Sequence, residues 1–355
     1  MTPIESLKTA FQERKLTLFL GAGVSVDNGF LLWEGLVLAM YFKIMDAQRL
    51  GMWRPFPNYL MAISEWQVEN LQEPLEITAR KIRLHYGDDQ PAFLNALRET
   101  LYQGFEPGDA GTYNVPAADE LMYGNPTLRA VAQLCENNHG GVKSVVTYNY
   151  DSLLQRFLYD DTYTTIYKKG QTPVDGTLPI YHVHGYVPFQ DANGSEPEDI
   201  IFTEDQYNLA ASNPDSWSNA LQLGAMSDAV GLMVGLSLSD RNIRRLFDVA
   251  RQSTNEITHF AILKRRTWKK PSAEELSKIN QKAKKYADRF LRSGVKGGPG
   301  MKKGPNWQNE ITGILREVQR KSDEQETLVL NELGIEPLWI DHYEEIPEII
   351  NQIQS

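Results

Sequence analysis

The sequence contains a single cysteine, Cys135, among 355 residues. One thiol excludes an internal disulfide and a zinc module built on four cysteines. Long apolar runs are also missing, because no stretch approaches the roughly 18 consecutive apolar residues of a membrane helix. The N-terminus, MTPIESLKTAFQERK, is patterned as an amphipathic helix without the basic and apolar regions of an export signal. We therefore expect a cytoplasmic protein.

The composition, with 41% hydrophobic and 23% charged residues, is typical of a globular protein. A net charge of -10 argues against a protein that coats nucleic acid. The basic residues are nevertheless concentrated, since residues 264–303 contain 14 Lys or Arg against 3 Asp or Glu. Two interpretations stay open for this basic segment: a solvated amphipathic helix, or a surface for an anionic partner such as an acidic protein face or nucleic acid.

Short β-branched runs alternate with longer helical patterns, which indicates an α/β fold with a parallel sheet and helices on both faces. The expected strands each end at a polar residue or a glycine, and they lie at 16–21, 143–148, 179–185, 231–236, 258–263 and 336–341. In open parallel sheets, ligands bind outside the carboxyl ends of the strands. We therefore look for chemistry directly after these runs.

About 120 residues separate the first two expected strands. A direct crossover needs only a dozen or so residues, so we expect an inserted helical layer at about 34–139, interrupted by an irregular stretch at 104–120. A second irregular stretch, VKGGPGMKKGP at 295–305, is expected to be mobile. A long charged helix from about 306 to 331, a last strand and a closing helix from about 344 are expected to follow.

The first motif is LFLGAGVS, in which an apolar strand runs into Gly21, Ala22, Gly23 and Ser25. Glycines let the backbone approach a pyrophosphate, while amide groups and a following helix N-terminus supply positive potential. The usual dinucleotide fingerprint has a third glycine, which would fall at Val26. A phosphate cradle and an ordinary tight turn therefore both stay open.

The second motif, VVTYNYDS, presents Thr147, Asn149 and Asp151 at alternate positions, which places all three on one face. An amide can orient a ribose hydroxyl or a water molecule, and Asp151 can bind a ribose or cap the next helix. A helix cap with a structural amide explains the pattern equally well.

The third motif is IYHVHGYV, in which His182 and His184 also alternate. A metal pair is disfavoured because no Cys, Asp or Glu stands at a ligand spacing. A histidine at the carboxyl end of a strand is better explained as a general base. We assign His182 a structural role and keep His184 as the candidate base.

The fourth motif is LMVGLSLSDRN, a strand that ends in Gly235 and Ser237 before a helix capped by Ser239 or Asp240. Gly235 permits close approach, Ser237 offers a hydroxyl, and the helix N-terminus favours a phosphate, which suits an adenosine nucleotide. An ordinary strand, cap and helix is the alternative.

Taken in order, GAGVS, TYNYD, HVHG and GLS resemble the sirtuin superfamily from about Leu16 to Asp341, and most of all its prokaryotic sirtuin-like NADases of antiphage defence. The resemblance implies a Rossmann-like fold in one domain over 1–355. Its core would be about 1–33 and 140–355, with the helical insertion at about 34–139. NAD+ is implied as the substrate, and no metal is expected.

By the same resemblance, Asn149 and His184 are the catalytic residues. The residues expected to contact the cofactor follow strand ends or begin the next helix: Gly21, Ala22, Gly23, Ser25, Trp33, Thr147, Asp151, Gly235 and Ser237. Trp33 resembles a tryptophan of the prokaryotic defence proteins.

Deacylases of the superfamily have a four-cysteine zinc ribbon and a Pro-Asp-Phe-Arg stretch, and neither is present here. Water is therefore the expected acceptor, which gives nicotinamide and ADP-ribose. The alternatives are an NAD-dependent ADP-ribosyltransferase or deacylase, and a sensor or scaffold that binds NAD or ADP-ribose without turnover. A nuclease has no supporting metal constellation.

In this branch, depletion of NAD+ is the toxic step of abortive infection and awaits a signal. The resemblance implies a homo-oligomer that works with a HerA-type ATPase or, alternatively, an Argonaute-type protein. The basic segment 264–303 is the candidate contact surface. We expect no membrane contact, and contact with nucleic acid only indirectly or through this segment.

Overall fold

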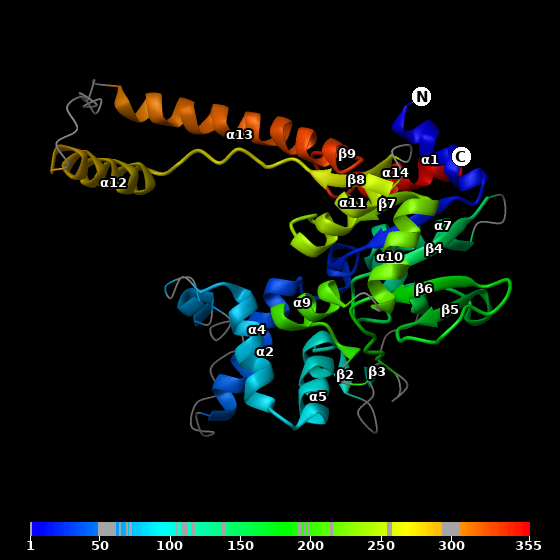
Figure 1. The fold of residues 1–355 in the computed structure, drawn as a ribbon. Helices are drawn as coiled ribbons and strands as arrows, with labels where there is room; N and C mark the ends of the chain where they lie inside the picture. Colours follow the sequence, from blue (N-terminus) through cyan, green and yellow to red (C-terminus); the bar gives the residue numbers. More distant parts are fainter. Residues whose placement is uncertain are drawn as a thin grey trace. The chain divides into compact units, whose positions relative to one another are not determined.

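The structure is a computed structural model whose main feature is a central sheet surrounded by helices (Figure 1). It describes residues 2–48, 62–63, 65–68, 70, 73–103, 105–107, 113–114, 118–136, 140–189, 194, 196, 199–213, 216–253, 258–292 and 306–355. The irregular stretch expected at 295–305 lies outside the described residues, as does part of the stretch at 104–120.

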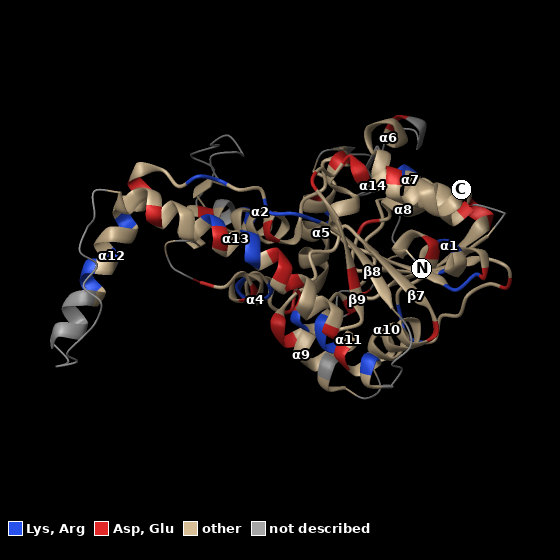
Figure 2. Cartoon of the chain, turned by 90° about the horizontal axis from the view of Figure 1, so that it is seen from above, with Lys and Arg blue, Asp and Glu red and all other residues tan. Residues whose placement is uncertain are grey.

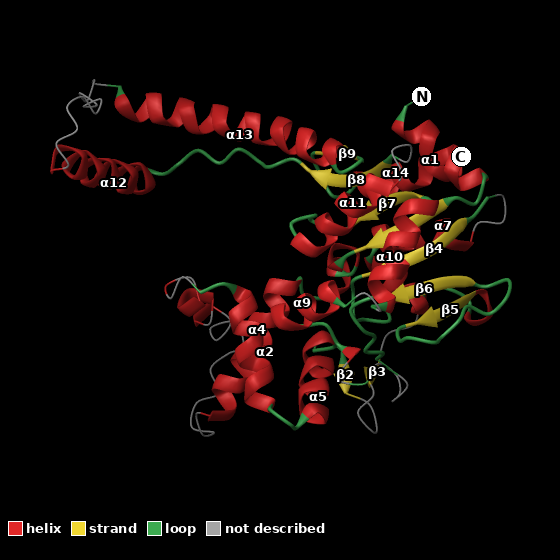
Figure 3. Cartoon of the chain, in the orientation of Figure 1, coloured by secondary structure: helices red, strands yellow, loops and turns green. Residues whose placement is uncertain are grey.

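Seven strands make up the central sheet: β1 (Leu16–Leu20), β4 (Val142–Thr147), β5 (Tyr163–Ile166), β6 (Leu178–His182), β7 (Val230–Val234), β8 (His259–Lys264) and β9 (Ile335–Ile340). Their spatial order is β5-β6-β4-β1-β7-β8-β9. β1 pairs in parallel with β4 and β7, and the pairs β4–β6, β5–β6 and β7–β8 are also parallel (Figure 3). The expected α/β fold with a parallel sheet is confirmed.

The helices of the main unit include α1 (Pro3–Gln12), α2 (Trp33–Gln48), α4 (Leu75–Tyr86), α5 (Gln90–Leu101), α6 (Ala118–Gly124), α7 (Pro126–Glu136), α8 (Leu153–Arg156), α9 (Glu204–Ser212), α10 (Trp217–Asp228), α11 (Arg241–Ser253) and α14 (Glu345–Gln354). Figure 2 shows α7, α8 and α14 on one side of the sheet and α10 and α11 on the other. Each face of the sheet is therefore covered.

β1 is the middle strand, and all five of its residues are buried. A parallel strand covered on both faces must be apolar throughout, which is why LTLFL shows no alternation. The one polar residue, Thr17, is 0% exposed, and its Oγ1 lies 2.9 Å from Oγ of Ser144 on β4. This bond satisfies both buried hydroxyls, so the polar pair is compatible with the core.

Between β1 and β4 the described residues form the expected helical layer, in which α2 packs on α4 and α5. α7 falls within the expected insertion but packs against α14 on the face of the sheet, so it is a covering helix of the core. Within the expected irregular stretch, Glu106–Pro107 and Tyr113–Asn114 pair as a short antiparallel ribbon.

Two local expectations are wrong. The GAG turn is not followed directly by an α-helix, because two 3₁₀ turns at Ala22–Val24 and Val26–Asn28 come next and α2 begins only at Trp33. The expectation of six strands also falls one short, because β5 is a further strand of only four residues, YTTI, whose β-branched residues favour a strand. A run of four residues is too short for its pattern to distinguish a strand from a loop.

Residues 264–332 form a compact unit of their own, separate from the unit made by residues 1–263 and 333–355. The smaller unit contains α12 (Ala273–Arg292) and α13 (Trp307–Glu332). Arg266 bonds Ser322 and Glu326 of α13, both at 2.9 Å. The division into a single domain with an insertion, expected from the sequence, stays a prediction. Among the described residues, no helix is long and apolar enough to cross a membrane.

Substitution of Gly23 tests the close contact between the turn after β1 and the turn after β7. A Cβ on Gly23 would lie 2.8 Å from Cα and 2.9 Å from the carbonyl oxygen of Gly235, and backbone atoms cannot easily yield. We expect Gly23→Ala to lower the free energy of unfolding by about 1–3 kcal/mol, measured by urea denaturation.

Gly224→Ala is the matched control, because this glycine lies within α10 and a Cβ there would meet nothing within 4 Å. Alanine at an open helical position is expected to stabilise the protein by about 0.5–1 kcal/mol. Equal urea midpoints for the two variants would contradict the close backbone contact.

Candidate functional site

The turn after β1 packs directly against the turn after β7. A Cβ on Gly21 would lie 2.5 Å from the carbonyl oxygen of Gly235, and Gly235 itself has a φ of +69°. A Cβ on Gly235 would lie 2.6 Å from the amide nitrogen of Val24. Close backbone packing thus explains all three glycines of the first and fourth motifs without a ligand.

Several amides of the GAG turn are used within the protein. Gly23 N–H donates to Gly235 O, Val24 N–H to Gly21 O and Ser25 N–H to Ala22 O, at 3.0–3.1 Å. A phosphate would have to displace one of these bonds or use another group. Phosphate binding by Gly21, Ala22 and Gly23 therefore stays a prediction.

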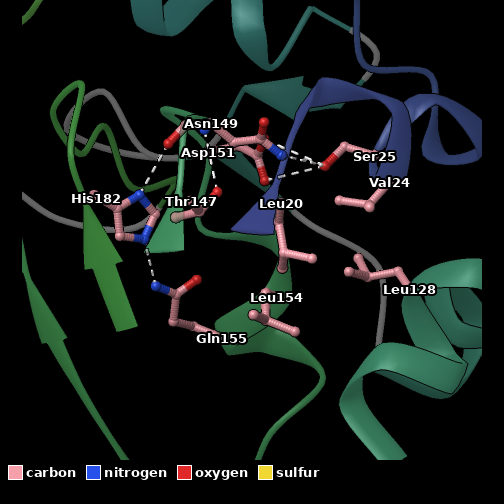
Figure 4. Close-up of a pocket in the computed structure, with 10 residues that line it drawn as sticks. All are labelled: Leu20, Val24, Ser25, Leu128, Thr147, Asn149, Asp151, Leu154, Gln155 and His182. Carbon is pink, nitrogen blue, oxygen red and sulfur yellow. Dashed lines mark hydrogen bonds between the residues drawn. The ribbon is translucent and has the colours of Figure 1, made fainter. Parts of the chain in front are cut away.

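A small cavity lies beside this turn, and Figure 4 shows its lining. The lining residues come from β1, β4, β6, α7, α8 and the turns between them: Leu20, Val24, Ser25, Leu128, Thr147, Asn149, Asp151, Leu154, Gln155 and His182. Its volume is about 10 Å³, close to what one water molecule needs. The cavity brings together Thr147, Asn149 and Asp151, which the alternation placed on one face, and adds Ser25 from the GAG turn, but it is nearly closed.

Ser25 links the GAG turn to the end of β4. Its hydroxyl donates to the Asp151 carboxylate at 3.3 Å, and Asn149 Nδ2 donates to Gly21 O at 3.2 Å and to Ser25 Oγ at 3.4 Å. Asp151 also accepts the Leu153 amide of α8 at 3.0 Å. Burial raises the pKa of the Asp151 carboxyl to about 6. This carboxylate therefore lies buried among hydrogen-bond donors.

His182 has a hydrogen-bond partner at each ring nitrogen. Nδ1 lies 2.9 Å from the Asn149 carbonyl oxygen, and Nε2 lies 2.7 Å from Gln155 Nε2. The carbonyl only accepts and the amide nitrogen only donates, so Nδ1 carries the proton and Nε2 accepts. Burial also lowers the pKa of His182 to about 4. These contacts support the structural role expected for His182.

The expectation that His184 shares a face with His182 is wrong. β6 ends at His182, so the two-residue period of a strand no longer applies at His184. Its Nδ1 lies 3.2 Å from the Tyr207 hydroxyl of α9, and its ring packs edge-on against Tyr148. Burial lowers its pKa to about 4, and the charge of Asp240 opposes that shift.

The two predicted catalytic residues thus lie on different sides of the end of β4. Asn149 lines the cavity on the α7 and α8 side, whereas His184 lies beside Tyr148, whose hydroxyl donates to Gln222 of α10 at 2.9 Å. Within the described part of the chain, no hydrogen bond joins Asn149 to His184.

The remaining predicted cofactor residues lie outside the cavity lining. Trp33 begins α2, is half-buried against the core, and its buried Nε1 has no hydrogen-bond partner among the described residues. Ser237 is exposed, with its hydroxyl 2.7 Å from that of Ser239. The helix cap expected at Ser239 or Asp240 is Asp240, whose Oδ1 accepts the Asn242 and Ile243 amides.

Sequence reasoning missed two site residues. Gln155 is 6% exposed, and its Oε1 is buried without a partner in the described part of the molecule. It follows Asp151 by four residues at the start of a helix, a spacing that could have indicated a shared face. Tyr207 contacts His184 because α9 packs beside the histidine, and no spacing in the sequence predicts this contact.

Residues 143–286 match the model of the SIR2-like domain family. The SIR2-like segment covers less than half of the chain, includes Asn149, Asp151 and His184, and leaves the GAG turn outside. A search of curated proteins gave no match.

One solved structure, described as "Structural Basis for the Mechanism and Regulation of Sir2 Enzymes", is 16% identical. The alignment covers 74% of this chain and 86% of that chain, at a TM-score of 0.34. A TM-score this low supports no inference about the site. Among the described residues, no group of three or more His, Cys, Asp or Glu is placed to hold a metal.

The raised pKa of Asp151 predicts a pH-dependent difference in stability. We expect Asp151→Asn to be more stable than the wild type above pH 6, because the variant keeps an acceptor for Leu153 N–H but buries no charge. Since the folded pKa exceeds the unfolded value, this wild-type penalty develops as pH rises from about 4 to 6 and reaches about 3 kcal/mol.

Urea denaturation of both proteins from pH 4 to pH 8 measures this difference. The buried histidines are present in both proteins, so their effect on the free energy of unfolding cancels in the difference between the variant and the wild type. A difference that stays constant across this range would contradict a raised pKa for Asp151.

Proposed function

We propose that this protein hydrolyses NAD+ to nicotinamide and ADP-ribose. The observation that supports this most is the division of polar groups at the end of β4: Ser25, Asn149 and Asp151 on one side, and the buried imidazole of His184 on the other. Glycosidic cleavage requires a site for the departing base and a separate approach for the nucleophile. The similarity of residues 143–286 to the SIR2-like domain favours NAD+ as the dinucleotide.

The cavity side suits the departing nicotinamide. Leu128 and Leu154 offer apolar surface to a pyridine ring, and the Asp151 carboxylate and Asn149 amide can bond a carboxamide. Because the cavity volume is only about 10 Å³, its walls must move apart before a ring can enter. The proposal therefore requires the site to open when the dinucleotide binds.

The other side suits the nucleophile. Departure of neutral nicotinamide with the electron pair of the C1–N bond leaves positive charge on the ribose. Water forms the new bond to C1, and its proton passes to His184, which is neutral at pH 7 because burial lowers its pKa to about 4. Asn149, on the cavity side, holds the ribose hydroxyls. The reaction requires no metal.

We expect Asn149→Ala and His184→Ala to fold normally and to reduce nicotinamide release by about a hundredfold or more, as is usual when a general acid-base group is lost. His342→Ala is the control, because this histidine is exposed in the loop before α14. Retained hydrolysis in either site variant would remove that residue from the mechanism.

Product analysis distinguishes the alternatives. Free ADP-ribose indicates hydrolysis, whereas label retained on protein, or an acylated ADP-ribose, indicates an ADP-ribosyltransferase or deacylase. Binding of NAD+ or ADP-ribose without turnover, under all conditions including added partner, would favour a sensor or scaffold. One cysteine cannot build the deacylase zinc ribbon, which favours water as the acceptor.

We further propose that the activity serves as the toxic effector of an antiphage system and is released by a partner. The nearly closed cavity fits an enzyme that is inactive until activated. The smaller unit supplies a candidate contact surface, since Lys282, Lys284 and Lys285 are exposed. Figure 2 shows Lys and Arg on α12 in blue. A HerA-type ATPase is the preferred partner, an Argonaute-type protein the alternative, and the effector is expected to be a homo-oligomer.

Replacing Lys282, Lys284 and Lys285 by Gln tests this contact. We expect the variant to keep its fold and to lose co-elution with an added HerA-type ATPase, because charged residues at the rim of an interface govern association. Arg320→Gln on α13 serves as the control, since its guanidinium pairs within its own helix with Glu317 and Glu324. Unchanged co-elution of the triple variant would exclude α12 as the contact surface.

A further inference from the structure

The imidazole of His184 is held between two aromatic rings. The rings of Tyr148 and Tyr207 pack edge-on against it, with centroids 5.1 Å and 5.0 Å away. The histidine is 6% exposed. Packing of this kind restricts the tilt of the imidazole, but by itself does not decide which ring nitrogen carries the proton.

Only one nearby tyrosine hydroxyl bonds the imidazole in the described part of the chain. The Tyr148 hydroxyl donates to Gln222 Oε1 at 2.9 Å, and the Tyr150 hydroxyl donates to the Ile201 carbonyl at 2.6 Å. The Tyr207 hydroxyl lies 3.2 Å from Nδ1 of His184. Tyr207 is therefore the side chain whose polar atom bonds a ring nitrogen, beside a hydrogen bond between the imidazole and the Tyr148 backbone.

Tyr207 is itself anchored at the beginning of α9. The Tyr207 amide donates to Thr203 O at 3.0 Å, and Gln206 Oε1 accepts the Thr203 amide at 3.0 Å. The preceding segment is tied to the histidine, because Ile201 N–H donates to His184 O at 2.9 Å. α9 thus begins at a defined distance from the imidazole.

We propose that Tyr207 is a positioning residue for His184, whose hydroxyl acts together with the backbone hydrogen bond to Tyr148 to fix the orientation of the imidazole and the nitrogen that carries the proton. The proposal rests on the proposed function, in which His184 accepts a proton from water. A neutral imidazole has one donor and one acceptor nitrogen, so the wrong tautomer presents N–H where a lone pair is needed.

The groups that face His184 and influence its titration come from three elements. Tyr148 follows β4, Tyr207 belongs to α9, and Asp240 precedes α11. Burial disfavours the charged imidazole and lowers its pKa to about 4, whereas the Asp240 charge and a hydrogen bond to the Tyr148 backbone favour the charged form. Loss of the Tyr207 hydroxyl changes a hydrogen bond to the ring and leaves burial and the Asp240 charge in place.

Tyr207→Phe and Tyr148→Phe form a matched pair, because each keeps an edge-on ring and removes one hydroxyl. We expect Tyr207→Phe to lower kcat for nicotinamide release at least about tenfold, to leave KM for NAD+ little changed, and to shift the pH profile. Tyr148→Phe removes the hydroxyl that donates to Gln222, so this variant is expected to lose stability while keeping the wild-type pH profile.

A second readout does not depend on turnover. With ¹⁵N-histidine in the full chain, and His184→Ala to assign the signal, Tyr207→Phe is expected to change the ring nitrogen shifts of His184 and Tyr148→Phe to leave them near wild type. If the wild type never releases nicotinamide, the proposed function fails while these shifts still decide the role of Tyr207. Equal His184 ring nitrogen shifts in Tyr207→Phe and Tyr148→Phe would overturn the positioning role. In an active protein, equal kcat values and equal pH profiles for the two variants would overturn it as well.

Discussion

The close contact between two backbone turns determines the rest of the site. Gly23, after the central strand β1, meets Gly235, after β7, with too little space for a side chain on either. This contact sets the path of the chain to Ser25, whose hydroxyl bonds Asp151, while Asn149 bonds Gly21 O. Hydrogen bonds therefore tie the polar end of β4 to the turn after β1, and backbone packing against Gly235 holds that turn in place.

The end of β4 divides the candidate chemistry between the two faces of the sheet. Asn149 and Asp151 lie toward α7 and α8, whereas Tyr148 lies toward α10 and the turn that holds His184. A leaving group and a nucleophile can thus approach one ribose carbon from different sides. The same buried environment raises the pKa of Asp151 and lowers that of His184.

Residue patterns predicted six strands and the parallel sheet, because buried parallel strands are apolar throughout and end at polar residues or glycines. Alternation also predicted that Thr147, Asn149 and Asp151 lie on one face, and all three line the same cavity. It failed at His184, since the strand ends two residues earlier and the turn redirects the side chain. Contacts between distant elements, such as Tyr207 with His184 or Gly23 with Gly235, depend on tertiary packing that no local pattern encodes.

A crystal structure of His184→Ala with NAD+ bound tests the central claim most directly, because the variant is expected to bind the dinucleotide without cleaving it. The account predicts an opened cavity with nicotinamide against Ser25 and Asp151 on the α7 and α8 side, and ribose C1 beside Asn149. Nicotinamide placed on the other side, against Tyr148 and Tyr207, would contradict the assignment of the two faces.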